Sequence, residues 1–250
     1  MTETHDSGVV AVIGASRGIG AATALELARR GYTVACLTRQ GRGVEEGPVP
    51  PELAARLLPF ACDVADEPSL ARALKAAAAR GGLRGLVNSA GLHTAAPSAT
   101  LPAVELRNLL EINVIGLFSA CREAYPHLKA HGGGLIVNLG SMFDAMGVPR
   151  NLAYAASKAA VAAMTRCLAV EWAKDRIAVV NVAPGYVETD LNRGFLGKQT
   201  VRDYLLPRIP AGRWGRTDEV ARLIAALFGE RLDFMTGETL YMDGAHRIAH

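Results

Sequence analysis

The chain has 250 residues, of which 50% are hydrophobic and 20% charged, and its 27 basic and 24 acidic residues give a formal net charge of +3. This composition supplies enough apolar material for one sizeable core, and chains of this length often form a single α/β domain. Because like charges form no run along the chain, neither nucleic acid nor a membrane surface is an expected partner.

The beginning of the chain and its cysteines bear on where the protein works. Residues 1–7 are polar and acidic, lack the positive region and apolar stretch of a signal peptide, and are predicted to form a flexible tail. No apolar run has the length of a membrane-spanning helix. The four cysteines form no CxxC pair, and the six histidines form no HxxxH or HExxH pattern. We therefore expect a cytoplasmic protein without a metal site.

Short apolar runs, glycine-rich or polar turns and helical stretches alternate along the chain. The first run, Val9–Ile13, is a predicted buried strand, and a helix is predicted over residues 18–30. Near-continuous apolar strands are typical of a parallel sheet with helices on both faces. The sequence therefore predicts one Rossmann-type α/β domain over residues 8–250, doubly wound around a mostly parallel sheet. The further predicted strands are 33–37, 58–62, 86–88, 135–139 and 177–183, and the further predicted helices are 67–80, 102–129 and 152–174.

Two segments depart from this alternation. Residues 41–51 are rich in glycine and proline and are predicted to be a loop within the domain. Residues 192–214 interrupt the rhythm near the end of the chain and are predicted to form a mobile flap over the substrate.

A glycine-rich turn follows the first predicted strand and opens the first predicted helix. Glycine allows a sharp turn and lets a phosphate approach the backbone, and the free N–H groups at the start of a helix bind anions. The spacing GxxxGxG differs from GxGxxG, and the Gly-Lys-Ser/Thr of a P-loop is absent. A plain tight turn is the alternative, but the place between strand and helix favours a dinucleotide site. The turn consists of Gly14, Ala15, Ser16, Arg17, Gly18, Ile19 and Gly20.

The residues after the second predicted strand favour the phosphorylated dinucleotide. An acidic residue about 20 residues after the turn normally binds the adenosine ribose of NAD. Here the strand ends in Leu37, Thr38 and Arg39, and no acid comes before Glu45. A carboxylate would repel a 2′-phosphate, whereas Arg39 and Arg17 could pair with it through charge-assisted hydrogen bonds. NADP(H) is therefore expected rather than NAD(H), unless both arginines are merely solvated loop residues.

Tyr154 and Lys158 lie four residues apart near the start of a predicted helix, which places both side chains on one face. A phenol with an ordinary pKa of about 10 is a poor acid or base at neutral pH, and a nearby ammonium is expected to bring that pKa toward the working range. Ser141, thirteen residues before Tyr154, follows a predicted strand, where its hydroxyl could hold a carbonyl oxygen. The tyrosine–lysine spacing alone would indicate only a surface pair.

Taken together with the glycine-rich turn, these residues match a known family. From Gly8 to about Gly244 the chain resembles the short-chain dehydrogenase/reductases, and within them most of all the 3-oxoacyl-acyl-carrier-protein reductases. Several motifs occur in the order that is usual for the family. They are the glycines of the turn, Cys62-Asp63-Val64, Asn88-Ser89-Ala90-Gly91, Asn113-Val114-Ile115-Gly116, Ser141, Tyr154-Ala155-Ala156-Ser157-Lys158, and Pro184-Gly185-Tyr186-Val187-Glu188-Thr189.

The resemblance implies roles for four residues in a hydride transfer. Tyr154 would be the general acid in reduction and the general base in oxidation, and Lys158 would hold the nicotinamide ribose and lower the tyrosine pKa. Ser141 would polarise the substrate carbonyl. Asn113 would hold a water that relays protons to Lys158. The cofactor itself carries the hydride chemistry, and the protein orients the reactants.

The resemblance also implies a set of dinucleotide contacts. Asp63 and Val64 would contact the adenine, and residues 88–91 would shape the pocket beneath the ribose. Val187 and Thr189 would fix the nicotinamide carboxamide. The expected cofactor-binding residues are Gly14, Ser16, Arg17, Gly18, Ile19, Gly20, Arg39, Asp63, Val64, Asn88, Ala90, Gly91, Tyr154, Lys158, Pro184, Gly185, Val187 and Thr189.

The expected activity is the reversible, NADP(H)-dependent reduction of a ketone or a 3-oxoacyl thioester to a secondary alcohol. The alternatives are an NAD-dependent sugar, polyol or secondary-alcohol dehydrogenase of the same family and, in another class, a non-catalytic dinucleotide-binding sensor or scaffold. Members of the family usually assemble through the helices predicted here at 102–129 and 152–174, so a homotetramer or homodimer is expected.

The substrate pocket is expected to be mainly apolar, which suits a hydrophobic or acyl-chain carbonyl. Packing of the flap is the alternative role for each lining residue. An acyl carrier protein would require basic residues near the mouth, such as Lys129, Arg176 and Arg193, although ordinary solvated charges explain these as well. The expected lining residues are His93, Thr94, Met142, Phe143, Asp144, Met146, Tyr186, Leu191, Phe195 and Leu196.

Overall fold

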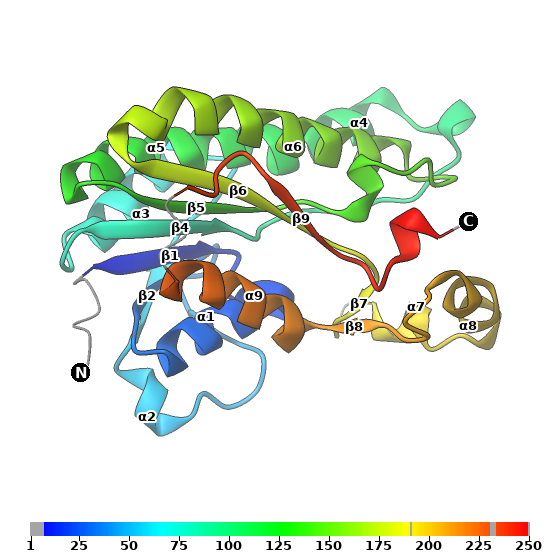
Figure 1. Cartoon of the computed structure of the whole chain (residues 1–250), viewed down its shortest axis with the longest axis horizontal. Helices are drawn as coiled ribbons and strands as arrows, with labels where there is room; N and C mark the ends of the chain where they lie inside the picture. Colours follow the sequence, from blue (N-terminus) through cyan, green and yellow to red (C-terminus); the bar gives the residue numbers. More distant parts are fainter. Residues whose placement is uncertain (1–7, 191, 231–233, 250) are drawn as a thin grey trace.

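The computed structural model describes residues 8–190, 192–230 and 234–249. The predicted tail over residues 1–7 and the predicted lining residue Leu191 lie outside these ranges. The described chain forms a seven-stranded sheet in the order β3-β2-β1-β4-β5-β6-β9, in which all neighbours are parallel (Figure 1). The strands are β1 (Val9–Ile13), β2 (Thr33–Thr38), β3 (Leu57–Ala61), β4 (Leu83–Asn88), β5 (Gly134–Leu139), β6 (Ile177–Pro184) and β9 (Thr239–Met242).

Helices cover both faces of this sheet (Figure 1). On one face lie α3 (Glu67–Ala78), α4 (Ala103–Leu110), α5 (Leu117–His131) and α6 (Leu152–Trp172), and on the other α1 (Gly18–Arg29), α2 (Pro51–Ala54) and α9 (Thr217–Gly229). Alternate residues of β1 serve the two layers: Val9, Ala11 and Ile13 pack with the first group, and Val10 and Val12 with the second. Side chains alternate between the faces of a sheet, so an all-apolar strand fits one that is buried on both sides. The predicted doubly wound α/β fold is confirmed.

The predicted helix over residues 102–129 is present as a helical run from Ala103 to His131, but it contains a π-helical turn that was not predicted. α4 ends at Leu110, a π-helical turn runs over Glu111–Gly116, and α5 begins at Leu117. This turn carries Asn113, whose buried side chain forms hydrogen bonds with the N–H and the C=O of Leu92 in the loop after β4, at 2.7 and 2.9 Å. Local widening of a helix has no signature in apolar periodicity. The sequence therefore predicts one regular helix where the structure has α4, a π-helical turn and α5.

The sheet also differs from the prediction in its strands. β4 begins at Leu83, three residues before the predicted start at residue 86. The prediction started late because Arg84 and Gly85 interrupt the apolar run. Gly85 is nevertheless required inside the sheet, since a Cβ there would lie 2.2 Å from Cε1 of Phe228 on α9. β9 at the edge of the sheet is not predicted, because its four residues are only half buried and form no long apolar run.

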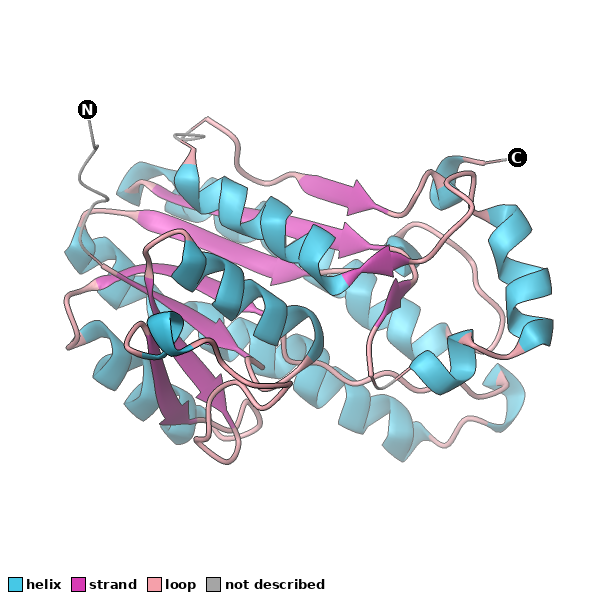
Figure 2. Cartoon of the chain, turned by 90° about the horizontal axis from the view of Figure 1, so that it is seen from below, coloured by secondary structure: helices cyan, strands magenta, loops and turns pink. Residues whose placement is uncertain are grey.

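The segment predicted as a flap, residues 192–214, contains two short helices, α7 (Arg193–Leu196) and α8 (Gln199–Leu205), which extend beyond the end of the large sheet (Figures 1 and 2). It has an apolar cluster of its own, made by Leu196, Leu205, Ile209 and Trp214. A two-stranded parallel sheet of β7 (Val187–Glu188) and β8 (Gly215–Arg216) joins the two ends of the segment. Its mobility stays a prediction.

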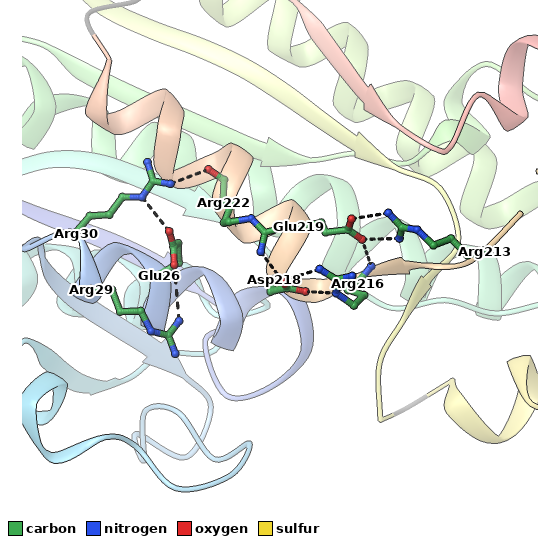
Figure 3. A network of polar contacts seen from close by, with 8 residues as sticks. All are labelled: Glu26, Arg29, Arg30, Arg213, Arg216, Asp218, Glu219 and Arg222. Carbon is green, nitrogen blue, oxygen red and sulfur yellow. Dashed lines mark hydrogen bonds and ion pairs between the residues drawn. The ribbon is translucent and has the colours of Figure 1, made fainter. Parts of the chain in front are cut away.

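Charged side chains join the end of this segment to α9, and α9 to α1 (Figure 3). Arg213 forms two hydrogen bonds with the carboxylate of Glu219, at 2.8 and 2.7 Å. Arg30, directly after α1, donates to Glu26 at 2.9 Å and to the C=O of Arg222 on α9 at 3.5 Å. Exposed ion pairs stabilise a fold only weakly, so the buried apolar contacts of α1 and α9 hold these helices to the sheet.

Candidate active site

The predicted site residues converge at the carboxyl ends of β1, β4, β5 and β6. β1 and β4 are neighbours although β2 and β3 lie between them in the chain, so the strand order reverses at this point. Ile13, Asn88, Asn138 and Asn181 are register partners across the four strands. β1 and β4 end at these residues, whereas β6 continues to Pro184. Open α/β sheets bind their ligands in such a crevice.

The glycine-rich turn connects β1 to α1 as predicted, and two of its glycines cannot carry a side chain. Gly14 has a φ of +82°, and a Cβ there would lie 2.7 Å from the backbone N of Ala90. A Cβ on Gly20 would lie 2.1 Å from the carbonyl oxygen of Gly14. At Gly18 only the Thr189 methyl group would be nearby, at 3.6 Å. The turn therefore packs tightly against the loop after β4, and its Gly18 side stays open.

The turn binds an anionic group that belongs to the chain itself. The N–H of Gly18 donates a hydrogen bond to the carboxylate of Glu46, and the N–H of Glu45 donates to the C=O of Ser16 at 2.8 Å. Because α1 has no acidic residue in its first turn, Glu46 supplies the negative charge that the start of a helix favours. The turn therefore fits an anion such as a phosphate.

Arg17 and Arg39 border the same turn, and both side chains are exposed. Neither forms an ion pair with any residue in the described ranges, whereas Arg42 pairs with Glu45 at 3.6 Å. Both guanidinium groups are thus available to an anionic ligand.

Ser141, Tyr154 and Lys158 meet where β5 ends and α6 begins. The side chains of Ser141 and Tyr154 share a hydrogen bond. The Lys158 Nζ lies 5.5 Å from the centroid of the Tyr154 ring and donates to the C=O of Leu139 at 2.7 Å. Ser141 and Lys158 are buried and Tyr154 is half-buried. The structure thus brings together the three residues that the sequence singled out, and their catalytic roles stay a prediction.

Burial governs the titration of this group. It raises the pKa of Tyr154 above its ordinary value of 10.0, although the hydrogen bond with Ser141 acts in the opposite direction. It lowers the pKa of Lys158 from 10.5 to about 8, against the upward effect of the Asp144 charge. The net shift of the tyrosine pKa in the described chain is thus upward rather than the expected downward one, because water is lost around the phenolate.

Asn113 links the loop after β4 to α6. Besides its bonds to Leu92, its amide donates to Oγ of Ser157 at 3.1 Å, and that hydroxyl donates to the C=O of Tyr154 at 2.7 Å. A Cβ on Gly91 would lie 3.3 Å from Oδ1 of Asn113 and 3.9 Å from the Lys158 Nζ, so the missing side chain of Gly91 leaves space between the two. Asn113 therefore holds the backbone that faces Lys158, and its role in a water relay stays a prediction.

The other predicted cofactor residues fall into two groups. Ala90, Gly91 and Thr189 lie at the crevice, as the contacts above show. Asn88 is buried, donates to Oδ1 of Asn138 at 2.9 Å, and points into the core rather than the crevice.

The remaining five predicted contacts lie directly after β3 or between the end of β6 and β7. Asp63 is exposed and accepts a hydrogen bond from the N–H of Ala65 at 3.0 Å. Val64 packs against the core. Val187 is buried in β7, and Gly185, after Pro184, donates its N–H to the C=O of Met242 at 2.9 Å.

An aromatic row extends from Tyr154 toward the 192–214 segment. Phe143 lies 5.8 Å from Tyr154 and 6.0 Å from Tyr186, and Tyr186 lies 6.0 Å from Trp214, all between ring centroids. Two predicted lining residues serve packing instead: Met142 and Leu196 are only 1% and 2% exposed. Trp214 was missed as a member of this wall because its contact with Tyr186 depends on how the segment folds back.

The described residues hold no group of three or more His, Cys, Asp or Glu side chains arranged for a metal ion. Likewise, none of the described helices is both long and apolar enough to cross a membrane. All four cysteines are free thiols. Burial raises the pKa of Cys36, Cys62 and Cys121 to about 12, so these thiols stay protonated and pack as small apolar side chains.

Known proteins with this arrangement are similar to the chain over nearly its whole length. A 2-(R)-hydroxypropyl-CoM dehydrogenase from Xanthobacter autotrophicus is 35% identical to this chain over 246 residues, which cover 96% of this chain and 98% of that protein. A human 3-oxoacyl-acyl-carrier-protein reductase is 34% identical over 241 residues, covering 96% and 98% of the two chains.

Solved structures agree with these relatives. A gluconate 5-dehydrogenase from Burkholderia cenocepacia, crystallised with NADP and tartrate, superposes with a TM-score of 0.87 at 31% identity, covering 98% of this chain and 97% of that one. The family model described as enoyl-(acyl carrier protein) reductase matches residues 14–245. The chain therefore belongs to the short-chain dehydrogenase/reductase family of oxidoreductases.

Proposed function

We propose that this chain is an NADP(H)-dependent oxidoreductase that reversibly reduces a carbonyl group, in a ketone or a 3-oxoacyl thioester, to a secondary alcohol. The main support is the meeting of a hydroxyl, a phenol and an amine, from Ser141, Tyr154 and Lys158, in a crevice bordered by an anion-binding turn. When bound, the reduced nicotinamide supplies the hydride that the carbonyl carbon accepts, and is oxidised in turn. The carbonyl oxygen then needs a proton, which a side chain must give.

Tyr154 is the proposed proton donor. Burial raises the pKa of its phenol, so the phenol holds its proton at neutral pH and can give it to the carbonyl oxygen. Ser141, which shares a hydrogen bond with the phenol, orients and polarises the same oxygen. Lys158, with its amine 5.5 Å from the ring, stabilises the phenolate left behind. In oxidation the phenolate takes the proton back.

Asn113 completes the proposed catalytic set by holding a water through which Lys158 exchanges protons. Its support is that the Asn113 amide and the Lys158 amine both lie beside Gly91. For the dinucleotide, the proposed contacts are those inferred from the sequence, except that Asn88 acts by fixing β4 to β5 through Asn138.

NADP(H) is proposed over NAD(H) because two exposed arginines, Arg17 and Arg39, border the turn without an ion-pair partner among the described residues. The gluconate 5-dehydrogenase relative was crystallised with NADP. Comparing kcat/KM for NADPH and NADH tests the choice. A preference for NADH would identify an NAD-dependent dehydrogenase instead.

Replacing Tyr154 with Phe tests the central role. The change removes one oxygen and keeps the ring, so kcat is expected to fall by about 10²–10⁴-fold, the range that general acid catalysis contributes. The dissociation constant of NADPH, measured by fluorescence, should stay within about twofold because the phosphates bind elsewhere. Turnover at the wild-type rate would refute the proposal, and loss of both turnover and NADPH binding would point to misfolding, which circular dichroism detects.

A carrier-bound substrate has weaker support than a free one. Of the basic residues considered for a carrier protein, Lys129 pairs with Asp175 at 3.0 Å and Arg193 with Glu188 at 2.9 Å. Their charges are thus already partly balanced.

We further propose a homotetramer or homodimer that assembles through α4, α5 and α6, working in the cytosol. Apolar side chains are exposed along these helices and the π-helical turn between α4 and α5: Val104 at 56%, Ile115 at 46%, Phe118 at 39% and Val170 at 82%. Exposed apolar side chains grouped in this way are typical of a subunit interface.

A further inference from the structure

His93, in the loop after β4, is held in one orientation beside Tyr154. Its Nε2 lies 2.8 Å from Oδ1 of Asn151, the residue before α6. The Asn151 amide nitrogen donates to the C=O of Pro149 at 2.9 Å, which fixes the carbonyl end of the amide toward His93. Since that oxygen can only accept, Nε2 of the neutral imidazole must carry the proton.

The other ring nitrogen is then an acceptor that the chain does not use. No described residue forms a hydrogen bond with Nδ1 of His93, and the side chain is exposed. The imidazole meets the Tyr154 ring edge to face, with 4.8 Å between centroids. Asn113 clamps the preceding Leu92, so the loop gives His93 little freedom. A fixed lone pair therefore lies next to the proposed proton donor.

Tyr154 also contacts the aromatic row, in which Phe143 and Trp214 offer no hydrogen-bond acceptor and Tyr186 offers its hydroxyl. A substrate whose carbonyl oxygen binds the Tyr154 phenol would lie beside that ring, which His93 contacts with 4.8 Å between centroids. A hydroxyl on the carbon next to the carbonyl could donate a hydrogen bond to Nδ1. A substrate without such a donor would displace water from Nδ1 and leave this nitrogen without a partner, which costs binding free energy.

We propose that His93 is a specificity-determining residue that accepts a hydrogen bond from a hydroxyl group next to the reacting carbon. The enzyme would then favour α-hydroxy ketones, and in reverse vicinal diols, over plain ketones and 3-oxoacyl thioesters. This inference rests on the proposed function, since it takes Tyr154 as the group that receives the carbonyl.

A matched substrate pair, 3-hydroxy-2-butanone and 2-butanone, tests it with the full chain and NADPH. In the wild type kcat/KM should be higher for the hydroxy ketone. His93→Phe keeps an aromatic ring against Tyr154 but has no hydrogen-bond acceptor. It should lower kcat/KM for the hydroxy ketone by about tenfold, mainly by raising KM. The value of kcat/KM for 2-butanone should stay within about twofold of the wild type. His93→Gln, which restores an acceptor oxygen, should recover part of the loss.

An equal loss on both ketones would overturn the inference, because His93 would then only support Tyr154. No loss on either, or a wild-type preference for an acetoacetyl thioester that His93→Phe leaves intact, would overturn it too. These outcomes all presuppose wild-type turnover. A wild type that reduces no carbonyl compound with either dinucleotide would refute the proposed function instead.

A second inference comes from Glu46, at the other end of the crevice. Residues 41–50 run from β2 across the start of α1, where Glu46 accepts the hydrogen bond of the Gly18 N–H. The N–H of Glu45 is bonded to Ser16 of the turn itself, and Val44 and Val49 pack against the core. The segment is thus seated on the turn by several contacts.

A dinucleotide needs the same N–H groups for its phosphates. Two anions cannot share one helix start without strong repulsion, so a phosphate must displace the carboxylate. From this we infer that Glu46 is an autoinhibitory group that competes with the dinucleotide phosphates for the Gly18 N–H, and that the 41–50 segment is released when dinucleotide binds. This inference also rests on the proposed function.

The dissociation constant of NADPH, measured by fluorescence, separates the possibilities. Glu46→Gln removes the competing charge and should tighten NADPH binding by about fivefold. Glu45→Gln is the matched control, because the exposed Glu45 side chain contacts only Arg42 among the described residues, and should change the constant by less than about twofold. Inorganic pyrophosphate, used as a competitor of NADPH, should likewise bind more tightly to Glu46→Gln than to the wild type, and with nearly wild-type affinity to Glu45→Gln.

Unchanged NADPH affinity in Glu46→Gln would overturn the inference, and weaker affinity would make Glu46 a ligand of the cofactor rather than its competitor. If the wild type and both variants bind neither NADPH nor NADH, the proposed function fails rather than the role of Glu46.

Discussion

Asp144 is a charged neighbour of Lys158 that the proposed proton transfer does not use directly. Its carboxylate accepts a hydrogen bond from Tyr241 of β9 at 2.9 Å, and the positive charges of Arg247, Arg166 and Lys158 act on it. Burial raises the pKa of Asp144 and lowers that of Lys158 to about 8, and each charge opposes the shift of the other. Asp144 therefore helps to keep the amine protonated.

Replacing Asp144 with Asn removes this charge at nearly the same size. Lys158 holds its proton below its pKa and loses it as the pH rises through about 8, so wild-type activity should decline on the alkaline side in that region. In Asp144→Asn the decline should begin at lower pH, with kcat/KM at pH 8 reduced by about two- to fivefold. The measurement is a pH profile of kcat/KM. Tyr241→Phe, which keeps the carboxylate, is the control, and identical profiles for Asp144→Asn and the wild type would contradict the prediction.

The sequence predicts individual site residues where the type of side chain and its spacing along the chain point to the same reaction. The helical spacing of Tyr154 and Lys158 and the place of Ser141 after a strand were enough to bring the three together. Glu46 and Asn151 were not found, because their contacts depend on how two irregular loops fold, and loops have no period to follow. The upward direction of the Tyr154 pKa shift was not predicted, because it comes from burial, which a sequence does not display.

Among the elements, the start of α9 holds the far end of the 192–214 segment. Arg213 forms its two hydrogen bonds with Glu219, whose carboxylate also accepts from the N–H of Arg216 at 2.9 Å (Figure 3). Glu219→Gln keeps an acceptor for that N–H but loses the charge. We expect KM for a ketone to rise about two- to fivefold, with NADPH affinity and thermal stability nearly unchanged, since an exposed pair contributes little to the fold.

Steady-state kinetics on Glu219→Gln and on Arg222→Gln check this expectation. Arg222 pairs with Asp218 on the same helix but does not contact the segment, so its replacement should leave KM unchanged. Equal KM values for Glu219→Gln and the wild type would show that Arg213 is not what holds the segment in place.

The predicted bounds of helices and strands were wrong where contacts between distant parts of the chain, rather than the local apolar pattern, determine the structure. The strands of the sheet centre follow from uninterrupted apolar runs, whereas β4 contains Arg84 and Gly85, and Gly85 is explained only by the ring of Phe228 from a distant helix. The division of the 102–129 segment depends on the bonds of Asn113 to Leu92, which join parts of the chain that the local pattern treats separately.

At the scale of the whole molecule, the exposed apolar side chains on α5 and α6 predict an assembly. Phe118→Glu places a charge within this group and should at least halve the mass in solution, because a charge buried without a partner opposes association. Light scattering over a range of concentrations measures the mass. Lys75→Glu, at an exposed position on α3 outside the group, is the control and should leave it unchanged. A wild type that is monomeric at all concentrations would contradict the proposed oligomer.

The overall architecture was the most predictable level, since fully apolar strands alternating with helices admit few arrangements other than a doubly wound parallel sheet. The site position followed from it, because ligands bind where the strand order reverses. What the sequence did not predict is how the chain ends: β9 joins the edge of the sheet through backbone pairing with β6, and pairing of this kind leaves little trace in side-chain type.

The π-helical turn at Glu111–Gly116 makes the chain intolerant of length changes at that point. In a helix each residue advances the winding by about 100°. A π-helical turn holds one residue more than the α-helical turn that it replaces, so deleting one residue there would restore a regular helix with α4 and Val104 in place, but would remove the widened backbone that presents Asn113 to Leu92. A shortened variant is therefore expected to lose the Asn113 bonds and activity while it keeps its subunit contacts.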